Sequence, residues 1–155
     1  MGASQKMAKP ERFYYRSLIS NQLWGRLVRR IQRDHPSISG ELARSIMDAT
    51  LGFLFLCGNY PDRRFAPSRL VDIGWHTFLM YTRDYDSFCK RTVGGKFVHH
   101  EPNDLLSGRK FLSSETTVCF MDKAGILYNP KLWAHEVGSC DSCSDSCASC
   151  SDGCD

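Results

Sequence analysis

The sequence predicts an all-α fold: a small domain of four to five helices with irregular connections, followed by a disordered C-terminal tail. Apolar residues recur at the three- and four-residue spacing of a helix rather than in the alternation of a strand. Serines precede several of these stretches, as helix N-caps do. Residues 138–155 contain only Gly, Ser, Cys, Asp and one Ala, which offer no apolar surface for packing.

The chain therefore divides into a helical domain, residues 1–137, and a flexible tail, residues 138–155. A length of 155 residues is that of one domain with its own hydrophobic core. Hydrophobic residues at 42% and charged residues at 24% are ordinary globular usage, so the body is expected to fold.

The first helix is predicted over residues 12–34, and Pro36 ends it. One side carries the apolar residues Trp24, Leu27, Val28 and Ile31. The other side carries the basic residues Arg26, Arg29, Arg30 and Arg33. This stripe is either a solvated face or a surface for an anionic partner: RNA, DNA or the chain's own acidic tail. No base-reading motif accompanies it, so the sequence gives nucleic acid little support.

The second helix, residues 39–57, is expected to be the core helix. Ser39 is a good N-cap, and the later turns are apolar nearly all round. A third helix is predicted over residues 68–90, after Pro67.

The last predicted helix covers residues 114–123, with Gly125 as its stop. Residues 126–133 are apolar and turn-like, and we expect them to fold back over the core. No strand is predicted.

The third helix carries the candidate chemistry of the body. Asp72 and His76 are four residues apart, so they project from one face about a turn from each other. A carboxylate and an imidazole at this spacing can bind one divalent ion together. A third ligand has to come from elsewhere, and the best partners are His99 and His100 in the following loop. Cys89 lies roughly 20 Å along an unbroken helix, so it joins only if the helix breaks.

Three interpretations of Asp72, His76 and His100 stay open. In the first, Asp72 holds His76 by a hydrogen bond and both lock the loop onto the helix. In the second, the three residues bind a metal ion. In the third they are catalytic, either through metal-activated water or with His76 as a general base tuned by Asp72. The sequence favours a binding protein over an enzyme, because it has no nucleophile motif. It has no phosphate-binding glycine loop either, so no nucleotide cofactor is predicted.

The tail is the second candidate site. Two C-x2-C pairs separated by three residues, and one further cysteine, give the set Cys140, Cys143, Cys147, Cys150 and Cys154. Zinc binds four thiolates tetrahedrally and is the favoured ion, with Cu(I) on two or three thiolates as the alternative. The main functional prediction is a small binding protein that takes up a soft metal through these thiolates. A precursor whose tail is modified by another enzyme, and a tail without a fixed partner, also stay open.

The sequence predicts a cytoplasmic location. The N-terminus lacks the apolar segment of a secretory signal, and the longest dense apolar run, residues 51–57, is too short to span a bilayer. In a reducing compartment, eight cysteines favour metal or free thiols over disulfides.

Several segments resemble a known family. They are Val71-Asp72-Ile73-Gly74-Trp75-His76, Tyr81-Thr82-Arg83-Asp84-Tyr85, Phe88-Cys89, Phe97-Val98-His99-His100-Glu101-Pro102 and Asn129-Pro130-Lys131-Leu132-Trp133. Over about residues 15–135 the chain resembles the glycine-rich domain protein family, especially its short bacterial members, whose tails are often Cys-rich. Members of that family are mostly uncharacterised, and plant relatives are linked to stress responses and RNA binding.

The resemblance has two departures. Larger members often have a second histidine two residues after that of the Trp-His pair, and here Phe78 stands at that position. The RNA-binding and glycine-rich segments of those relatives are also missing. The resemblance therefore implies neither a metal centre nor RNA binding for this chain.

Overall fold

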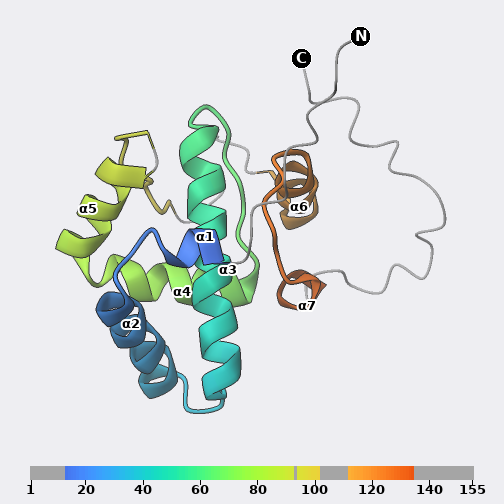
Figure 1. The fold of residues 1–155 in the computed structure, drawn as a ribbon. Coiled ribbons are helices and arrows are strands. Elements are labelled where there is room, and N and C mark those ends of the chain that lie inside the picture. Colours follow the sequence, from blue (N-terminus) through green and yellow to red (C-terminus); the bar gives the residue numbers. More distant parts are fainter. Residues whose placement is uncertain (1–12, 93, 102–111, 135–155) are drawn as a thin grey trace, which may run out of the picture.

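In the computed structural model, residues 13–92, 94–101 and 112–134 are described, and they form an all-helical body (Figure 1). The helices are α1 (Phe13–Arg16), α2 (Asn21–Asp34), α3 (Gly40–Asn59), α4 (Arg69–Leu79), α5 (Thr82–Thr92), α6 (Ser114–Lys123) and α7 (Pro130–Trp133). Five of these helices have ten or more residues, and α1 and α7 have four each. Within the described ranges the β pairing is one isolated bridge, between Phe65 and Leu112. The predicted all-α class is confirmed.

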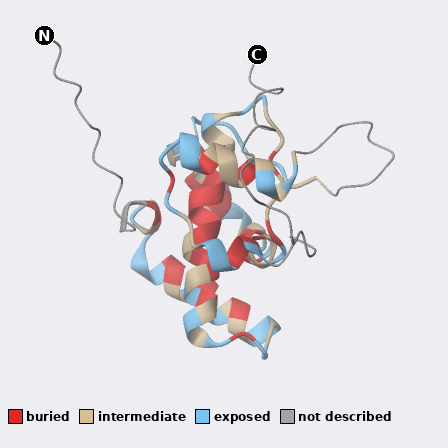
Figure 2. Cartoon of the chain, turned by 90° about the vertical axis from the view of Figure 1, so that its right-hand side faces the viewer, coloured by how far each residue is buried: buried red, intermediate tan, exposed pale blue. Residues whose placement is uncertain are grey.

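Helix α3 lies at the centre of the fold, as predicted. Helices α2 and α4 pack against it, α1 crosses it, and α6 and α7 lie on its other side (Figure 1). Figure 2 shows it buried along most of its length. Ten of its residues are buried, because its apolar side chains face neighbouring helices on nearly every side.

Serine caps set the starts of four helices. The side chains of Ser20, Ser39, Ser68 and Ser113 each accept a hydrogen bond from the backbone N–H three residues later. Such a bond satisfies one of the backbone donors that a helix N-terminus leaves without an intrahelical partner. The predicted starts at Ser39 and Ser68 are confirmed.

The prediction of one continuous helix over residues 12–34 is wrong. The chain leaves the helix after Arg16 and enters α2 at Ser20, whose hydroxyl caps Leu23. Ile19 lies in the intervening turn with 5% of its surface exposed. Ile19 keeps the four-residue spacing of the buried Leu23 and Leu27, so its side chain stays in the core while the chain changes direction at the break.

The predicted helix over residues 68–90 is also two helices. The chain turns at Met80 and Tyr81, between α4 and α5. After the turn, the rings of Tyr85 and Phe88 pack against Phe78, with centroid separations of 5.1 and 5.3 Å. All three rings are fully buried, so the turn lets α5 fold back onto the core.

The C-terminal part of the body covers the core as predicted. Helix α6 ends before Gly125, whose φ of 68° is a left-handed conformation that glycine adopts without a Cβ clash. The chain then returns through Ile126, Leu132 and Trp133, which are at most 5% exposed.

The remaining sequence predictions concern features that the described residues leave open. The tail, with all five of its cysteines, lies outside the described ranges, as do residues 1–12. Within those ranges no helix combines the length and apolar character that a membrane span requires. The predicted cytoplasmic location and the predicted flexibility of the tail stay predictions.

Candidate functional site

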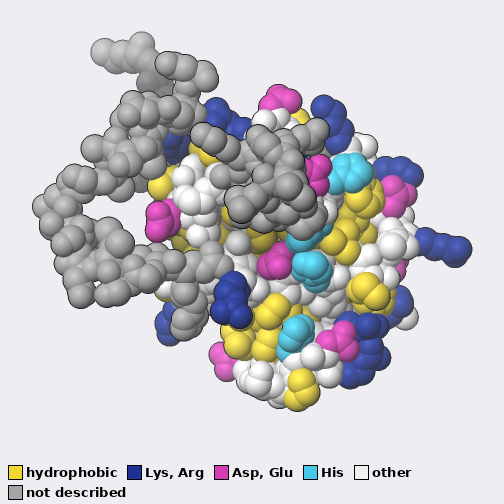
Figure 3. Space-filling view, turned by 180° about the vertical axis from the view of Figure 1, so that it is seen from behind, with side chains coloured by type: hydrophobic (Ala, Val, Ile, Leu, Met, Phe, Trp, Pro, Cys, Tyr) yellow, Lys and Arg dark blue, Asp and Glu magenta, His cyan; other side chains and the backbone are white. Residues whose placement is uncertain are grey.

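The outer face of α4 positions two of the predicted site residues. Asp72 lies in the first turn and His76 one turn later, so both side chains point away from the core. The side chain of Asp72 is 37% exposed and that of His76 is 62% exposed. Figure 3 shows histidine side chains beside acidic side chains on this side of the molecule.

The third residue, His100, comes from the loop after α5. This loop begins with a turn at Gly94 and Gly95, both of which have positive φ. It is then tied to the core, because the buried Tyr85 hydroxyl donates to the carbonyl oxygen of Val98 at 2.6 Å. The same hydroxyl accepts a hydrogen bond from Trp75 Nε1 at 2.9 Å. The loop position that carries His100 is therefore fixed by a buried hydrogen-bonded chain.

Asp72, His76 and His100 meet at one point. His100 Nε2 lies 2.7 Å from Asp72 Oδ1, and His76 Nε2 lies 3.4 Å from Asp72 Oδ2. The centroids of the two imidazole rings are 4.3 Å apart. One ligand atom from each residue lies within 4.8 Å of the other two. The structure thus brings together the three residues that the sequence analysis selected, and the hydrogen bond of Asp72 goes to His100.

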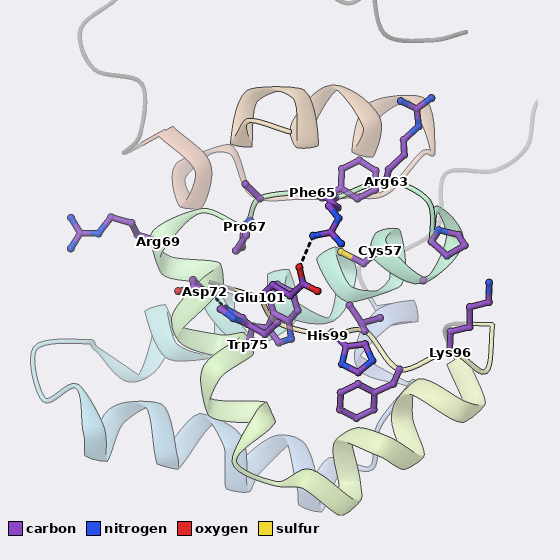
Figure 4. Close-up of a pocket in the computed structure, with 17 residues that line it drawn as sticks. Cys57, Arg63, Phe65, Pro67, Arg69, Asp72, Trp75, Lys96, His99 and Glu101 are labelled. Carbon is purple, nitrogen blue, oxygen red and sulfur yellow. Dashed lines mark hydrogen bonds and ion pairs between the residues drawn. The ribbon is translucent and has the colours of Figure 1, made fainter. Parts of the chain in front are cut away.

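Two other candidates lie elsewhere. His99 is exposed, and its ring faces Phe97 at 4.8 Å instead of the cluster (Figure 4). The helix predicted over residues 68–90 does break before Cys89, as would be needed for Cys89 to reach the cluster. Its side chain, however, is fully buried in the core. Burial raises the pKa of its thiol, so it stays protonated near neutral pH.

The geometry of the cluster is close to that of a metal site. Ligand atoms around a tetrahedral zinc ion, each about 2.0 Å from the metal, are about 3.3 Å from one another. The separation of 3.4 Å between His76 and Asp72 already matches this value. The Asp72–His100 pair at 2.7 Å is a hydrogen bond and would have to open by roughly half an ångström. The two contacts end on different oxygens of Asp72, so a single oxygen and both imidazoles reach one ion only after side-chain rotation.

A pocket adjoins the cluster. It has a volume of about 640 Å³, and Asp72 and His100 form part of its lining. Four basic side chains also line it: Arg63, Arg64, Arg69 and Lys96. Arg64 forms an ion pair with Glu101 inside the pocket (Figure 4). They could not be predicted from the sequence because they come from two segments, residues 63–69 and 96–101, which no local spacing connects.

Cys57 is a further lining residue of the pocket. Burial raises the pKa of its thiol, which is therefore protonated and a weak nucleophile near neutral pH.

The basic stripe of α2 is partly offset by acidic neighbours. Arg30 and Arg33 both bond to Asp34, and the Arg30 contact lowers the pKa of that carboxyl. Arg26 lies 3.9 Å from Asp84 and over the ring of Tyr81. Part of the stripe therefore belongs to surface ion pairs within the body, and an anionic partner for it stays a prediction.

Comparison with known proteins gives one match. A family model described as UCP032817-like matches residues 15–120, a range that contains all three residues of the Asp72–His76–His100 cluster. No curated protein and no solved structure shows significant similarity to the chain. The predicted kinship with the glycine-rich domain proteins stays a prediction.

Proposed function

The chain belongs to the UCP032817-like family, and we propose that it is a metal-binding protein whose body holds one divalent ion on Asp72, His76 and His100. The observation that carries this proposal is the convergence of the three ligand atoms within 4.8 Å of one another, from a helix and a separately anchored loop.

A purely structural role explains only part of the cluster. The hydrogen bond from His100 to Asp72 holds the loop on α4 and would be sufficient for that purpose. His76 is not needed for it, because its side chain is 62% exposed and contributes no atom to the Asp72–His100 hydrogen bond. An exposed imidazole at ligand distance from a carboxylate and a second imidazole is better explained by a shared cation.

Zinc is the ion that suits this ligand set best. Two imidazoles and one carboxylate are a zinc combination, and they leave a fourth position for water or another ligand. Bound there, zinc would supply a Lewis acid and lower the pKa of a bound water. Catalysis is therefore the second candidate function, favoured by the pocket of about 640 Å³ that opens beside Asp72 and His100.

Zinc titration of the full-length chain with its five tail cysteines replaced by serine tests the body site alone. We expect one equivalent of zinc to bind in competition with a chromophoric chelator. In this background His76→Ala should weaken zinc binding at least tenfold, since losing even an outer-shell partner costs roughly 10–100-fold. His99→Ala is the matched control, because His99 is an exposed neighbouring histidine that faces Phe97. Equal affinities for the two variants would overturn the proposal.

The tail remains a separate proposed site for a soft metal. It rests on the spacing of Cys140, Cys143, Cys147, Cys150 and Cys154, which lie outside the described residues. Zinc and copper contents of anaerobically purified full-length protein and of the five-serine variant test it. We expect the variant to lose metal and the remaining zinc to depend on His76. Equal contents in both proteins would remove the tail site.

A further inference from the structure

The pocket beside the cluster has an excess of positive charge. Its lining contains four Lys or Arg side chains and two acids, Asp72 and Glu101. The Arg64–Glu101 ion pair carries no net charge, so the formal excess comes from Arg63, Arg69 and Lys96 against Asp72, which bonds to His100. A cavity with this balance attracts anions, because field lines from like charges are concentrated between low-dielectric walls.

The same pocket has an exposed aromatic side chain in its lining. Phe97 lines it and is 40% exposed, whereas Phe65 and Trp75 also line it but are only 4% and 5% exposed, so Phe97 supplies most of the aromatic surface. A volume of about 640 Å³ is that of a small-molecule site and far exceeds one inorganic ion. The lining is therefore suited to a molecule with a charged group and a flat apolar part.

The Arg64–Glu101 pair shows which charged group the pocket accepts. Arg64 binds a carboxylate there, through a side chain that is 31% exposed. A guanidinium binds carboxylate and phosphate oxygens with similar geometry. Figure 4 shows the pair between the Asp72 end of the pocket and Arg63. An incoming oxyanion can thus replace the Glu101 carboxylate on Arg64.

We infer that this pocket binds a small organic anion, whose carboxylate or phosphate group takes the place of Glu101 on Arg64 and whose flat apolar part packs against Phe97. The inference deepens the proposed function, and only the expected effect of a bound metal ion on anion affinity rests on that function. A metal ion on Asp72 and His100 would add positive charge at the pocket edge and tighten binding of the same anion.

Binding of phenyl phosphate, benzoate, inorganic phosphate and the neutral benzyl alcohol to the full-length chain tests the inference. Titrations are followed by NMR chemical shifts, first in EDTA and then with zinc. We expect the two aromatic anions to bind more tightly than benzyl alcohol and inorganic phosphate. The ratio of phenyl phosphate to benzoate affinity distinguishes a phosphate ligand from a carboxylate ligand.

Two variants with opposite expected effects keep the test independent of stability. Arg64→Gln should weaken binding of the preferred anion about tenfold, as loss of a charge-assisted hydrogen bond does. Glu101→Gln should tighten it severalfold, because it removes the competing carboxylate. Arg83→Gln is the matched control, since Arg83 is an exposed arginine on α5 outside the pocket lining.

The outcomes separate this inference from the proposed function. Opposite shifts for Arg64→Gln and Glu101→Gln in EDTA support the inference even if the body binds no zinc. If zinc binds at His76 but benzyl alcohol binds as well as the aromatic anions, the inference is overturned and the metal site stands. Equal weakening by Glu101→Gln and Arg64→Gln would also overturn it, because that result reports a loosened pocket.

Discussion

The inner and outer faces of α4 differ in how closely their side chains are packed. On the inner face, Gly74 lies against α3 so closely that an added Cβ would be 2.0 Å from Thr50 Oγ1. On the outer face, Asp72 and His76 keep 37% and 62% of their side-chain surface exposed. One face of α4 is therefore too closely packed to accept another atom, whereas the other face carries partly exposed candidate metal ligands.

The inner face is also closed by hydrogen bonds. The Thr50 hydroxyl donates to the carbonyl oxygens of Ile46 and Val71 at 2.8 and 3.2 Å, and so joins α3 to α4. Trp75 continues the buried side with its bond to Tyr85.

This difference separates what the fold needs from what a ligand needs. Substitutions on the inner face should change the free energy of unfolding, whereas substitution of His76 should change metal binding and little else. Substitutions on the two faces, and a change of pH, test that separation.

Gly74→Ala should have the largest effect. Its Cβ would meet Thr50 Oγ1 at 2.0 Å and Ile46 Cγ2 at 3.0 Å, so α4 must move away from α3. Overpacking of this kind costs about 1–3 kcal/mol or more of unfolding free energy, measured by urea denaturation. The control is Gly25→Ala on α2, where the added Cβ meets only the flexible end of Arg29 at 3.4 Å. It should be neutral or up to about 1 kcal/mol stabilising, through helix propensity. Similar losses in both variants would contradict the close-packing argument.

Tyr85→Phe should come next. It removes the hydroxyl that accepts from Trp75 and donates to Val98, so two polar groups lose their partner. We expect a loss of about 2 kcal/mol in unfolding free energy, and weaker zinc binding because the loop that carries His100 loosens. Tyr128→Phe is the control, since its hydroxyl bonds to Asp122 at 3.2 Å on the surface. That variant should change stability by less than about 0.5 kcal/mol. A loss for Tyr128→Phe as large as that for Tyr85→Phe would remove the claim that the buried bridge is special.

The Tyr85 bridge should also make stability depend on alkaline pH. Burial raises the pKa of Tyr85 above its ordinary value, so the folded chain keeps a proton that the unfolded chain releases near pH 10. The unfolded state then binds fewer protons, and this contribution to stability falls by up to about 1.4 kcal/mol per pH unit above pH 10. Unfolding of the wild type and of Tyr85→Phe at pH 9 and pH 11 measures it. The difference between the two proteins should narrow at the higher pH, and a constant difference would count against the prediction.

His76→Ala should have the smallest effect on stability. The side chain is 62% exposed, so the change in unfolding free energy of the metal-free protein should stay within about 0.5 kcal/mol. His100→Ala is the comparison, because His100 is only 19% exposed, bonds to Asp72 and packs against Trp75 at 4.4 Å. It should cost about 1–2 kcal/mol. Equal costs for the two histidines would mean that the cluster is one structural network, and the metal proposal would lose its main support.

Local sequence signals predicted most of the helices. Ser39, Ser68 and Gly125 act as the caps and stop that their positions indicated, because capping is a contact between residues three or four apart. Ser20 had the same signal and was missed, since the apolar periodicity runs through it. The turn at Met80 has no proline or glycine, and it depends on Tyr85 and Phe88 reaching the core.

The pocket could not be predicted in the same way. Arg64 and Glu101 are 37 residues apart, and only the packing of the loop against α4 brings them together. The cluster was predicted in part, because residues four apart, such as Asp72 and His76, share a helix face however the helix packs in the fold.

The sequence by itself determined the helical class, the position of Asp72 and His76 on one helix face and the regular spacing of the tail cysteines. It left the third ligand of the body cluster open between His99 and His100. Neighbouring residues of an extended segment point to opposite sides, so only one of the two can face α4. The tertiary structure decided for His100, because the bond from Tyr85 to the Val98 carbonyl oxygen fixes which side of the loop faces Asp72.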